Sequence, residues 1–437
     1  MRTVSDVASF KQLAIYPERH IKAARPVHVW HLVLGWAILP PLFYLSENGT
    51  LIPTARGSSI GGDPRSSAVH MAGLAIVTLI CGVVIASRFS SLISLCARMK
   101  VFVAFPVLAI LSSVWSVQPR QSLISGIVLL IFTVFALYIG NRFNFQEQFE
   151  LIMLVGAVAL PLSIALALFV PGIGTSEAGW RGIFSHKQNC AAVSTLWLIT
   201  ALHWTCAGIY QRAFRFLYIL MCGVLIVMSR SRTGWALALI ALLLTGAIWF
   251  IQKLPTKELL LVLLIAIFVI GGLGYGIYDH STTILSTAGK DSTLSERTII
   301  WSAVWTEITK RPLLGYGFSA FWKGLYGPSQ EVVLISGWDV SQAQDGFLDA
   351  WLGVGIIGVG LVAAMALQSM KNAVRTLRSE SAAYVRWAVV VILCTLLYNI
   401  GESSLEVLHM VWFLFLLAYV GLNQTVLREQ LPWNLSH

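Results

Sequence analysis

The sequence predicts an all-α protein that spans a membrane with about twelve helices. Of its 437 residues, 57% are hydrophobic and only 11% are charged, whereas soluble domains carry about 25% charged residues. The mean hydropathy is +0.76, and a spanning helix needs about 20 apolar residues. This composition excludes a soluble globular enzyme, a disordered chain and a small disulfide-stabilised domain.

Apolar segments separated by polar stretches mark the predicted spans. Membrane helices tolerate the Gly and Pro residues that several of them contain, because neighbouring groups satisfy the freed backbone. In chain order the segments are Trp30–Leu45, Val69–Ala86, Val101–Trp115, Ser122–Gly140, Leu151–Val170, Asn189–Cys206, Phe214–Met228, Gly234–Ile251, Glu258–Tyr278, Phe347–Leu367, Tyr384–Ile400 and Leu405–Leu422.

The distribution of basic residues predicts that both termini lie in the cytoplasm. On this assignment the cytoplasmic segments hold 18 of the 30 Lys and Arg, as the positive-inside rule requires. Residues 1–28 then form a cytoplasmic tail with no cleaved signal peptide, and residues 29–278 contain nine spans. Residues 279–346 form a large outer loop, and residues 347–437 contain three spans and a short cytoplasmic tail.

Neither the net charge of +10 nor the six cysteines point to a further class of partner. The basic excess belongs to the cytoplasmic loops, so no nucleic-acid partner is expected. No two cysteines form a CxxC pair and no His stands at ligand spacing from one. Neither a structural zinc site nor a disulfide framework is therefore expected.

Two groups of cations lie on the outer side. Arg181, His186 and Lys187 precede the sixth span, and Arg230 and Arg232 form the turn between the seventh and eighth. The alternatives to a binding role are an interfacial belt for the first group and snorkelling arginines for the second. A binding role is favoured, because outer cations oppose the topology trend and the guanidinium fork matches phosphate oxygens.

The outer loop is predicted to contain an amphipathic helix over residues 298–310. Apolar residues that include Trp301 and Trp305 recur there at helical spacing, and Arg297 falls on the same face. That placement favours a buried partner for Arg297 over a surface position. Pro312 is expected to end the helix.

Carboxylates stand at two further outer positions. Asp345 and Asp349 open the tenth span and share one helix face. They either cap that helix or take part in chemistry, and both readings remain open. Glu402 and Glu406 lie in the short turn between the last two spans, and either is expected to pair with an outer arginine. The outer cations favour an anionic ligand such as phosphate or pyrophosphate, with no metal cage. An enzyme, a transporter and a lipid-binding scaffold all remain open from the residues alone.

These places, in this order, resemble the O-antigen ligase/polymerase family of bacterial envelope glycosyltransferases. The family pattern contains SxxWSxxP, WRGxFxHKN, SRSRTG, LSxRxxxW with PxxGxGxxxF, and an ending similar to HNGxLD. The matching stretches here are Ser112–Pro119, Trp180–Asn189, Ser229–Gly234, Leu294–Trp301 with Pro312–Phe318, and Gln344–Asp349.

The resemblance implies a GT-C-like, multi-pass enzyme of the bacterial inner membrane with a periplasmic active site and no cofactor. The implied donor is a glycan on undecaprenyl pyrophosphate, and the acceptor is a hydroxyl of a second glycan lipid. Membrane lipids and a chain-length regulator are the further expected partners. The residues assigned to catalysis are Arg232, Arg297, Gln344 and Asp345. Those assigned to substrate binding are Arg181, His186, Lys187, Arg230, Trp301, Trp305 and Glu402, and Trp338 is a further candidate for stacking on sugars.

One departure favours the exopolysaccharide polymerase branch of the family. The ligase pattern has His where this chain has Gln344, and Gln cannot act as a general base near neutral pH. Asp345 is the nearest candidate base, with His186 second. The expected function is therefore a polysaccharide polymerase. The alternatives are an O-antigen ligase acting on lipid A–core and, from another class, a transporter of lipid-linked oligosaccharides.

Overall fold

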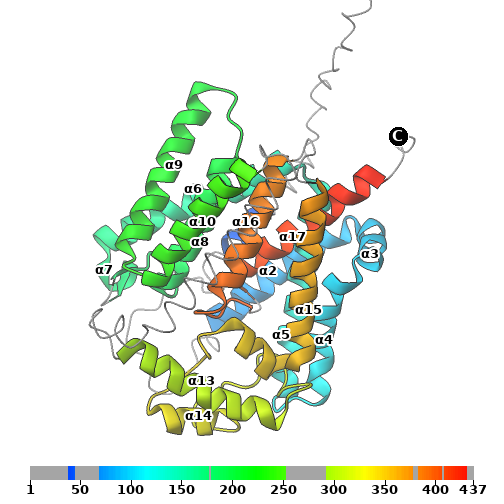
Figure 1. Ribbon diagram of the computed structural model, residues 1–437, viewed down its shortest axis with the longest axis vertical. Helices are drawn as coiled ribbons and strands as arrows, with labels where there is room; N and C mark the ends of the chain where they lie inside the picture. The colour runs from blue at the N-terminus through cyan, green and yellow to red at the C-terminus, as the bar shows by residue number, and fades with distance from the viewer. Residues whose placement is uncertain are drawn as a thin grey trace, which may run out of the picture.

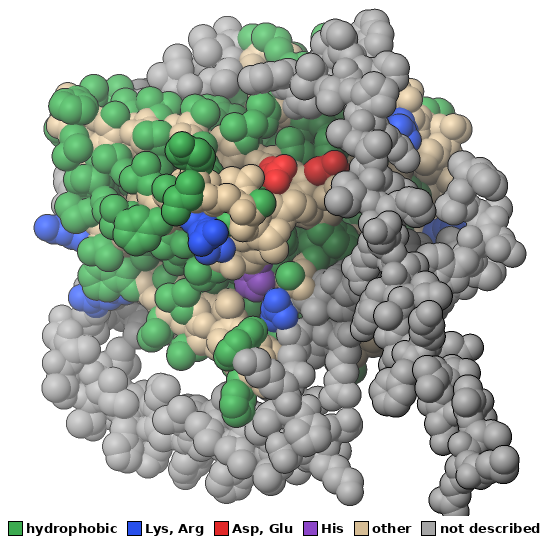
Figure 2. Space-filling model, turned by 90° about the horizontal axis from the view of Figure 1, so that it is seen from above, with side chains coloured by type: hydrophobic (Ala, Val, Ile, Leu, Met, Phe, Trp, Pro, Cys, Tyr) green, Lys and Arg blue, Asp and Glu red, His purple; other side chains and the backbone are tan. Residues whose placement is uncertain are grey.

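The computed structural model of the protein is a bundle of long helices with two further helices across one end. It describes residues 38–44, 68–176, 179–251, 292–376, 382–405 and 408–430. Figure 1 shows the bundle helices running side by side, with α13 (Ser292–Lys310) and α14 (Ser329–Ser336) crossing beneath them. Figure 2 shows the opposite end, where hydrophobic side chains are interspersed with Lys and Arg and few acidic side chains.

Regular structure in the described residues is almost entirely helical. Strands β1 (Thr175–Ser176) and β2 (Gly179–Trp180) form one short antiparallel pair, with Thr175 opposite Trp180. The bundle helices are α2 (Ala68–Ala86), α3 (Phe89–Arg98), α4 (Lys100–Leu111), α5 (Pro119–Arg142), α6 (Phe145–Phe169), α7 (Pro171–Gly174), α8 (Lys187–His203), α9 (Ile209–Met228), α10 (Arg232–Ile251), α15 (Gly346–Thr376), α16 (Ala382–Tyr398) and α17 (Met410–Gln430), and the 3-10 turn η2 (Ser112–Val114) follows α4.

The predicted class, an all-α membrane protein, is confirmed. Among the described residues five helices, α5, α6, α9, α10 and α15, are long and apolar enough to cross a membrane. Helices α2 and α3 meet at a 90° bend and make a sixth candidate as a pair. The predicted segment Glu258–Tyr278 and most of Trp30–Leu45 lie outside the described residues. The twelve-span count and the GT-C-like architecture therefore stay predictions.

The most enclosed helices are α8 and α17. Residues 410–424 of α17 are all buried, as are residues 189–201 of α8. The indole N–H of Trp387 in α16 donates to the hydroxyl of Thr200 in α8 over 2.9 Å. This hydrogen bond links the last turn of α8 to the first half of α16.

The segment after α13 docks onto a break in α15. Gly355 lies inside α15 with φ of 70° and ψ of −174°. The amide of Ile356 donates to the carbonyl of Pro312 over 3.0 Å, and the carbonyl of Leu352 accepts from the amide of Tyr316 over 2.7 Å. The segment after α13 thus satisfies backbone groups of α15 that the break in this helix would otherwise leave without partners.

The stretch Ser112–Pro119 holds the other side of the same segment. The indole of Trp115 donates to the carbonyl of Leu314 over 2.9 Å, and the amide of Val117 donates to the carbonyl of Tyr316 over 2.9 Å. The hydroxyl of Ser112 accepts from the amide of Phe318 over 2.9 Å. Two stretches that match the family pattern, Ser112–Pro119 and Pro312–Phe318, are therefore hydrogen-bonded to each other. We call this pair of stretches, together with the break in α15 that it contacts, the clasp.

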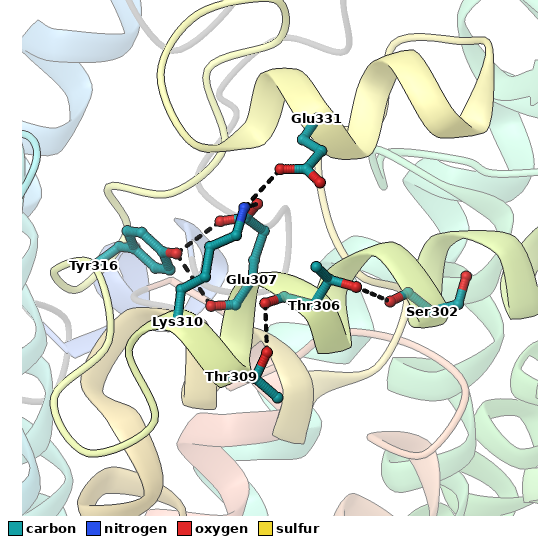
Figure 3. Close-up of polar contacts among 7 residues, drawn as sticks. All are labelled: Ser302, Thr306, Glu307, Thr309, Lys310, Tyr316 and Glu331. Carbon is teal, nitrogen blue, oxygen red and sulfur yellow. Dashed lines mark hydrogen bonds and ion pairs between the residues drawn. The ribbon is translucent and has the colours of Figure 1, made fainter.

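A buried acidic side chain ties α13 and α14 to this clasp (Figure 3). Glu307 is 2% exposed. It accepts from the hydroxyl of Tyr316 over 2.7 Å and from the ammonium of Lys310 over 2.6 Å. Lys310 also donates to Glu331 of α14 over 2.6 Å. Because Glu307 is paired and hydrogen-bonded, it fixes α13 relative to the Tyr316 turn without an uncompensated buried charge.

The clasp gives a first prediction, for the variant Gly315→Ala. Gly315 has φ of +66°, and a Cβ there would lie 2.4 Å from the carbonyl oxygen of Leu352. Both the left-handed backbone and the contact with fixed backbone oppose a side chain. We expect a loss of stability of about 2 kcal/mol or more, measured as a lower melting temperature of the detergent-solubilised protein. Gly360→Ala in α15 is the matched control, because a Cβ there meets nothing within 4 Å. An equal melting temperature for both variants would contradict the docking role.

Candidate active site

Arg297 joins α13 to the end of the bundle. Its Nε donates to Oε1 of Gln344 over 2.9 Å, and its Nη2 donates to Oε1 of Glu402 over 3.1 Å. The side chains of Arg297 and Glu402 are 24% and 8% exposed. Arg297 thus has the buried partner that its place on the apolar face of α13 predicts, and that partner is one of the two carboxylates proposed from the sequence. Glu406, the other, lies outside the described residues.

The turn that carries Gln344 is held from two sides. Gln344 has φ of 53°, a left-handed conformation that is costly for a residue with a side chain. The indole N–H of Trp301 donates to the carbonyl of Ala343 over 3.0 Å, and Asp349 accepts from the amide of Ala343 over 3.0 Å. Trp301 therefore helps to position Gln344, whose Oε1 accepts from Arg297. This role of the indole N–H differs from the stacking on sugars that the sequence predicts for the ring.

Asp345 caps α15. Its Oδ1 accepts from the amides of Phe347 and Leu348 over 2.9 and 3.0 Å. Burial raises the pKa of this carboxyl, and the two backbone N–H donors oppose that rise. Of the two roles considered for Asp345 from the sequence, capping of the helix is therefore present in the structure. The cap uses one of its two carboxylate oxygens.

Asp349 tethers three segments to the start of α15. Besides the amide of Ala343, it accepts from the indole of Trp322 over 2.8 Å and from the hydroxyl of Ser403. Ser403 follows Glu402 directly in the loop between α16 and α17. Both partners of Arg297, Gln344 and Glu402, thus lie next to residues that Asp349 binds.

Asn399 organises residues 399–404 at the start of the loop between α16 and α17. The amide of Asn399 donates to the hydroxyl of Ser404 over 2.8 Å and accepts from the backbone N–H of Ser404 over 2.9 Å. The backbone carbonyl of Asn399 accepts from Gly346 over 2.8 Å. A Cβ at Gly346 would lie 1.9 Å from the side-chain oxygen of Asn399. The close approach that only glycine permits brings Gln344 and Glu402 to one site.

Burial raises the pKa of Glu402 to about 7. Arg297, the hydroxyl of Thr233 and the ammonium of Lys187 act in the opposite direction. Those contributions show that the first turns of α8 and α10 face the same carboxyl. The site therefore gathers Lys187, Thr233, Arg297, Gln344 and Glu402 from five separate segments.

The turn that carries Arg230 and Arg232 is built on buried serines. Ser231 accepts from the amide of Gly234 over 3.1 Å and so caps α10. Arg230 and Arg232 are both exposed, and Arg230 has φ of 49°. Both arginines thus remain accessible to a ligand at the start of α10.

The remaining predicted residues lie near the site to differing degrees. The Nε of Arg181 donates to the carbonyl of Ile173 over 2.7 Å, which uses part of its guanidinium within its own loop. His186 is exposed at the surface, but partial removal of its ring from water, and then the charge of Arg181, lower its pKa. Trp305 is 51% exposed and packs edge-on against Trp351, with ring centroids 5.6 Å apart.

Asn189 is a polar residue of the site region that the sequence reasoning passed over. It accepts from the hydroxyl of Tyr398 over 2.9 Å and lies 3.3 Å from Nε2 of His409. The amide of Val411 donates to Nδ1 of His409 over 3.2 Å. Asn189 ends the WRGxFxHKN stretch, so its motif position is the signal that could have marked it. Among the described residues, no three His, Cys, Asp or Glu side chains form a metal-binding group.

The fold and the site define an all-α membrane protein in which a helix across one end of an apolar bundle brings an arginine to a buried carboxyl. A family model described as O-antigen ligase matches residues 216–363. That range includes Arg232, Arg297, Gln344 and Asp345 and excludes Lys187 and Glu402.

A relative supports the same family. The exopolysaccharide production protein ExoQ of Rhizobium meliloti (strain 1021) is 23% identical over 293 residues. The alignment covers 63% of this chain and 66% of the relative, so the chain spans just under two thirds of the relative's length. Together the two comparisons confirm the resemblance to the O-antigen ligase/polymerase family, on its exopolysaccharide side.

The pKa of Glu402 gives a prediction for stability against pH. Its folded-state pKa of about 7 lies above the ordinary value of 4.5. The stabilisation from its protonated form is therefore full below about pH 4.5 and lost as the pH rises to about 7. We expect the melting temperature of the wild type to fall relative to that of Glu402→Gln between about pH 5 and pH 8.

The matched control for this experiment is Glu331→Gln. Hydrogen bonds from Lys310 lower the pKa of Glu331, so this carboxylate stays ionised throughout the same range. Its removal should shift the melting curve by a constant amount. Parallel curves for the wild type and Glu402→Gln would show that Glu402 does not titrate in this window.

Proposed function

We propose that the protein is a polysaccharide polymerase of the bacterial inner membrane. It transfers a growing glycan from undecaprenyl pyrophosphate to a lipid-linked repeat unit on the periplasmic face. The observation that carries this proposal is the position of Arg297, which Gln344 and Glu402 hold beside the turn with Arg230 and Arg232. A fixed arginine with accessible arginines nearby suits a pyrophosphate, whose oxygens accept the forked donors of guanidinium.

The helix ends at the site favour the same ligand. Helices α8 and α10 both begin here, and the first amides of an α-helix carry partial positive charge. His186, the residue before α8, makes no side-chain cap, so amides of that first turn are open to an anionic group. Lys187 adds a full charge at the same end. In the proposal Arg181, His186 and Lys187 bind or steer the second polyprenyl pyrophosphate.

The proposed reaction forms one bond and breaks one. The acceptor hydroxyl oxygen bonds to the anomeric carbon of the donor sugar, and the bond from that carbon to the pyrophosphate oxygen breaks. Undecaprenyl pyrophosphate leaves with the electron pair, and Arg232 and Arg297 stabilise its developing charge. Nε and Nη2 of Arg297 bind the protein, so Nη1 is the nitrogen available to a phosphate oxygen.

Asp345 is the proposed acceptor of the proton from the attacking hydroxyl. One of its oxygens caps α15, and the other is available to a substrate hydroxyl. Because burial raises its pKa, it is a stronger base than an ordinary carboxylate. Pyrophosphate is a good leaving group, so positioning of the two substrates supplies a large part of the rate.

The O-antigen ligase function is the second candidate, because the matched family model carries that description. It differs from polymerisation in its acceptor, which would be lipid A–core. Incubation with synthetic lipid-linked repeats, with and without lipid A–core, separates the two by product mass. Product that forms only with lipid A–core would favour the ligase, and polymer without it would favour the polymerase.

The arginines give a direct prediction for this assay. We expect Arg232→Ala and Arg297→Lys to reduce polymer formation by about tenfold to a thousandfold, as removal of a group that stabilises transition-state charge does. Lys keeps the charge of Arg297 but loses the planar fork, so this variant separates bidentate binding from steering. Arg212→Ala, an exposed arginine on α9, is the matched control. Full-length polymer from both site variants would refute the assignment.

The variant Asp345→Asn tests the proposed base. The amide oxygen of Asn can still accept from the amides of Phe347 and Leu348, so the cap of α15 is retained. We expect the melting temperature to change little and the transfer rate to fall by about 10²-fold or more. A rate within a few fold of the wild type would instead leave Asp345 with capping alone and assign the rate to positioning.

A further inference from the structure

Two open hollows meet at Lys323, a residue that lines both of them. The larger has a volume of about 540 Å³ and lies between the turn after Lys323 and the end of α14. The smaller has a volume of about 410 Å³ and lies between Lys323 and the start of α5, where Arg120 lines it. Pockets of this size hold small organic ligands. Of the residues given a role in catalysis or substrate binding above, Trp338 alone lines either hollow.

The larger hollow combines aromatic and charged groups. Trp338 and Tyr326 line it and are 39% and 77% exposed, and Lys323 and Asp339 line the same hollow. An exposed indole or phenol presents a flat apolar face, whereas ammonium and carboxylate groups bind hydroxyls. A pyranose has that dual character, because one face of the ring carries C–H groups and its edge carries hydroxyls.

The walls of the larger hollow are fixed without a ligand. The hydroxyl of Ser329 accepts from the amide of Lys323 over 2.9 Å and donates to the carbonyl of Gly324 over 3.0 Å. On the other wall, the hydroxyl of Ser336 donates to the carbonyl of Trp338 over 3.1 Å. Gly337 ends α14 in the left-handed conformation with φ of 83°. The backbone on both sides of the hollow is thus held by hydrogen bonds before a ligand binds, which limits the entropy that ordering it would cost.

A chain of contacts connects the hollows to the site. Trp322, the neighbour of Lys323, donates to Asp349 over 2.8 Å. Asp349 also binds Ala343 and Ser403, the residues next to the two partners of Arg297. Through Asp349, the segment that carries Lys323 is thus connected to the two residues that hold Arg297, and Arg120 and Lys323 bring basic side chains to the hollows.

We propose that the hollows lined by Trp338, Tyr326, Lys323 and Arg120 bind sugar residues of the glycan chain beyond the residue that reacts. The proposal rests on the polymerase function proposed above and names the glycan itself as the ligand of a second site. Trp338 stacks on a sugar ring, Asp339 and Lys323 bind its hydroxyls, and Arg120 binds the next residue along the chain. A polymer held here stays beside the site between successive transfers.

The test measures binding to oligosaccharide fragments made by partial hydrolysis of the polysaccharide that the same cells export. The full chain in lipid nanodiscs is titrated with these fragments by calorimetry. We expect Trp338→Ala to weaken binding at least tenfold and Lys323→Ala to weaken it several fold. Phe169→Ala is the matched control, because Phe169 is an 81% exposed aromatic of α6 that lines neither hollow. Its binding should equal that of the wild type.

A second readout is polymer length in the assay with lipid-linked repeats. We expect a shorter length distribution from Trp338→Ala than from Phe169→Ala. Equal affinities for the wild type and Trp338→Ala would overturn the second site and leave the exposed aromatic face to the membrane surface. Polymerisation by a wild type that binds no fragments would overturn it too. Binding that depends on Trp338 in a protein that makes no polymer would support the saccharide site while refuting the polymerase function.

Discussion

The pairing of Arg297 with the buried carboxyl of Glu402 is the interaction on which the candidate site depends. Removing Glu402 from water costs free energy, and its raised pKa shows that Arg297, Thr233 and Lys187 do not fully offset that cost. A buried pair of this kind is weak support for stability, but it specifies geometry, because few arrangements satisfy both groups. Here it requires α13, the start of α15 and the α16–α17 loop to meet at one point.

The clasp around the break in α15 makes that meeting possible. Tyr316 and Pro312 complete hydrogen bonds that the helix loses at Gly355, while the Ser112–Pro119 stretch holds the opposite side. Glu307 then fixes α13 to Tyr316. Arg297 and Glu307 lie on the same helix, α13. The contacts of Glu307 therefore help to set the position of the Arg297 side chain.

Sequence reasoning could identify residue types but not their long-range pairs. The helical spacing around Trp301 predicted an inward face for Arg297, and the short turn around Glu402 offered an acidic partner. Which carboxylate pairs with which arginine depends on tertiary contacts between residues 105 positions apart. For the same reason the role of Asn189 was missed, since its partners Tyr398 and His409 follow about half a chain later. The stacking of Trp301 on sugars stays a prediction, whereas periodicity could not show that its indole N–H donates to the carbonyl of Ala343.

The contacts of Gln344 explain what this residue does at the position where the ligase pattern has His. Its side-chain oxygen accepts a hydrogen bond from Arg297, and its left-handed backbone is held by Trp301 and Asp349. A neutral histidine at this position would also present a ring nitrogen that accepts from the same arginine. Gln and His therefore share the ability to orient Arg297. In the reaction proposed above the proton acceptor is Asp345, so position 344 need not supply a base, and the arginine proposed to bind pyrophosphate keeps its partner; this is compatible with a reaction whose leaving group is already good.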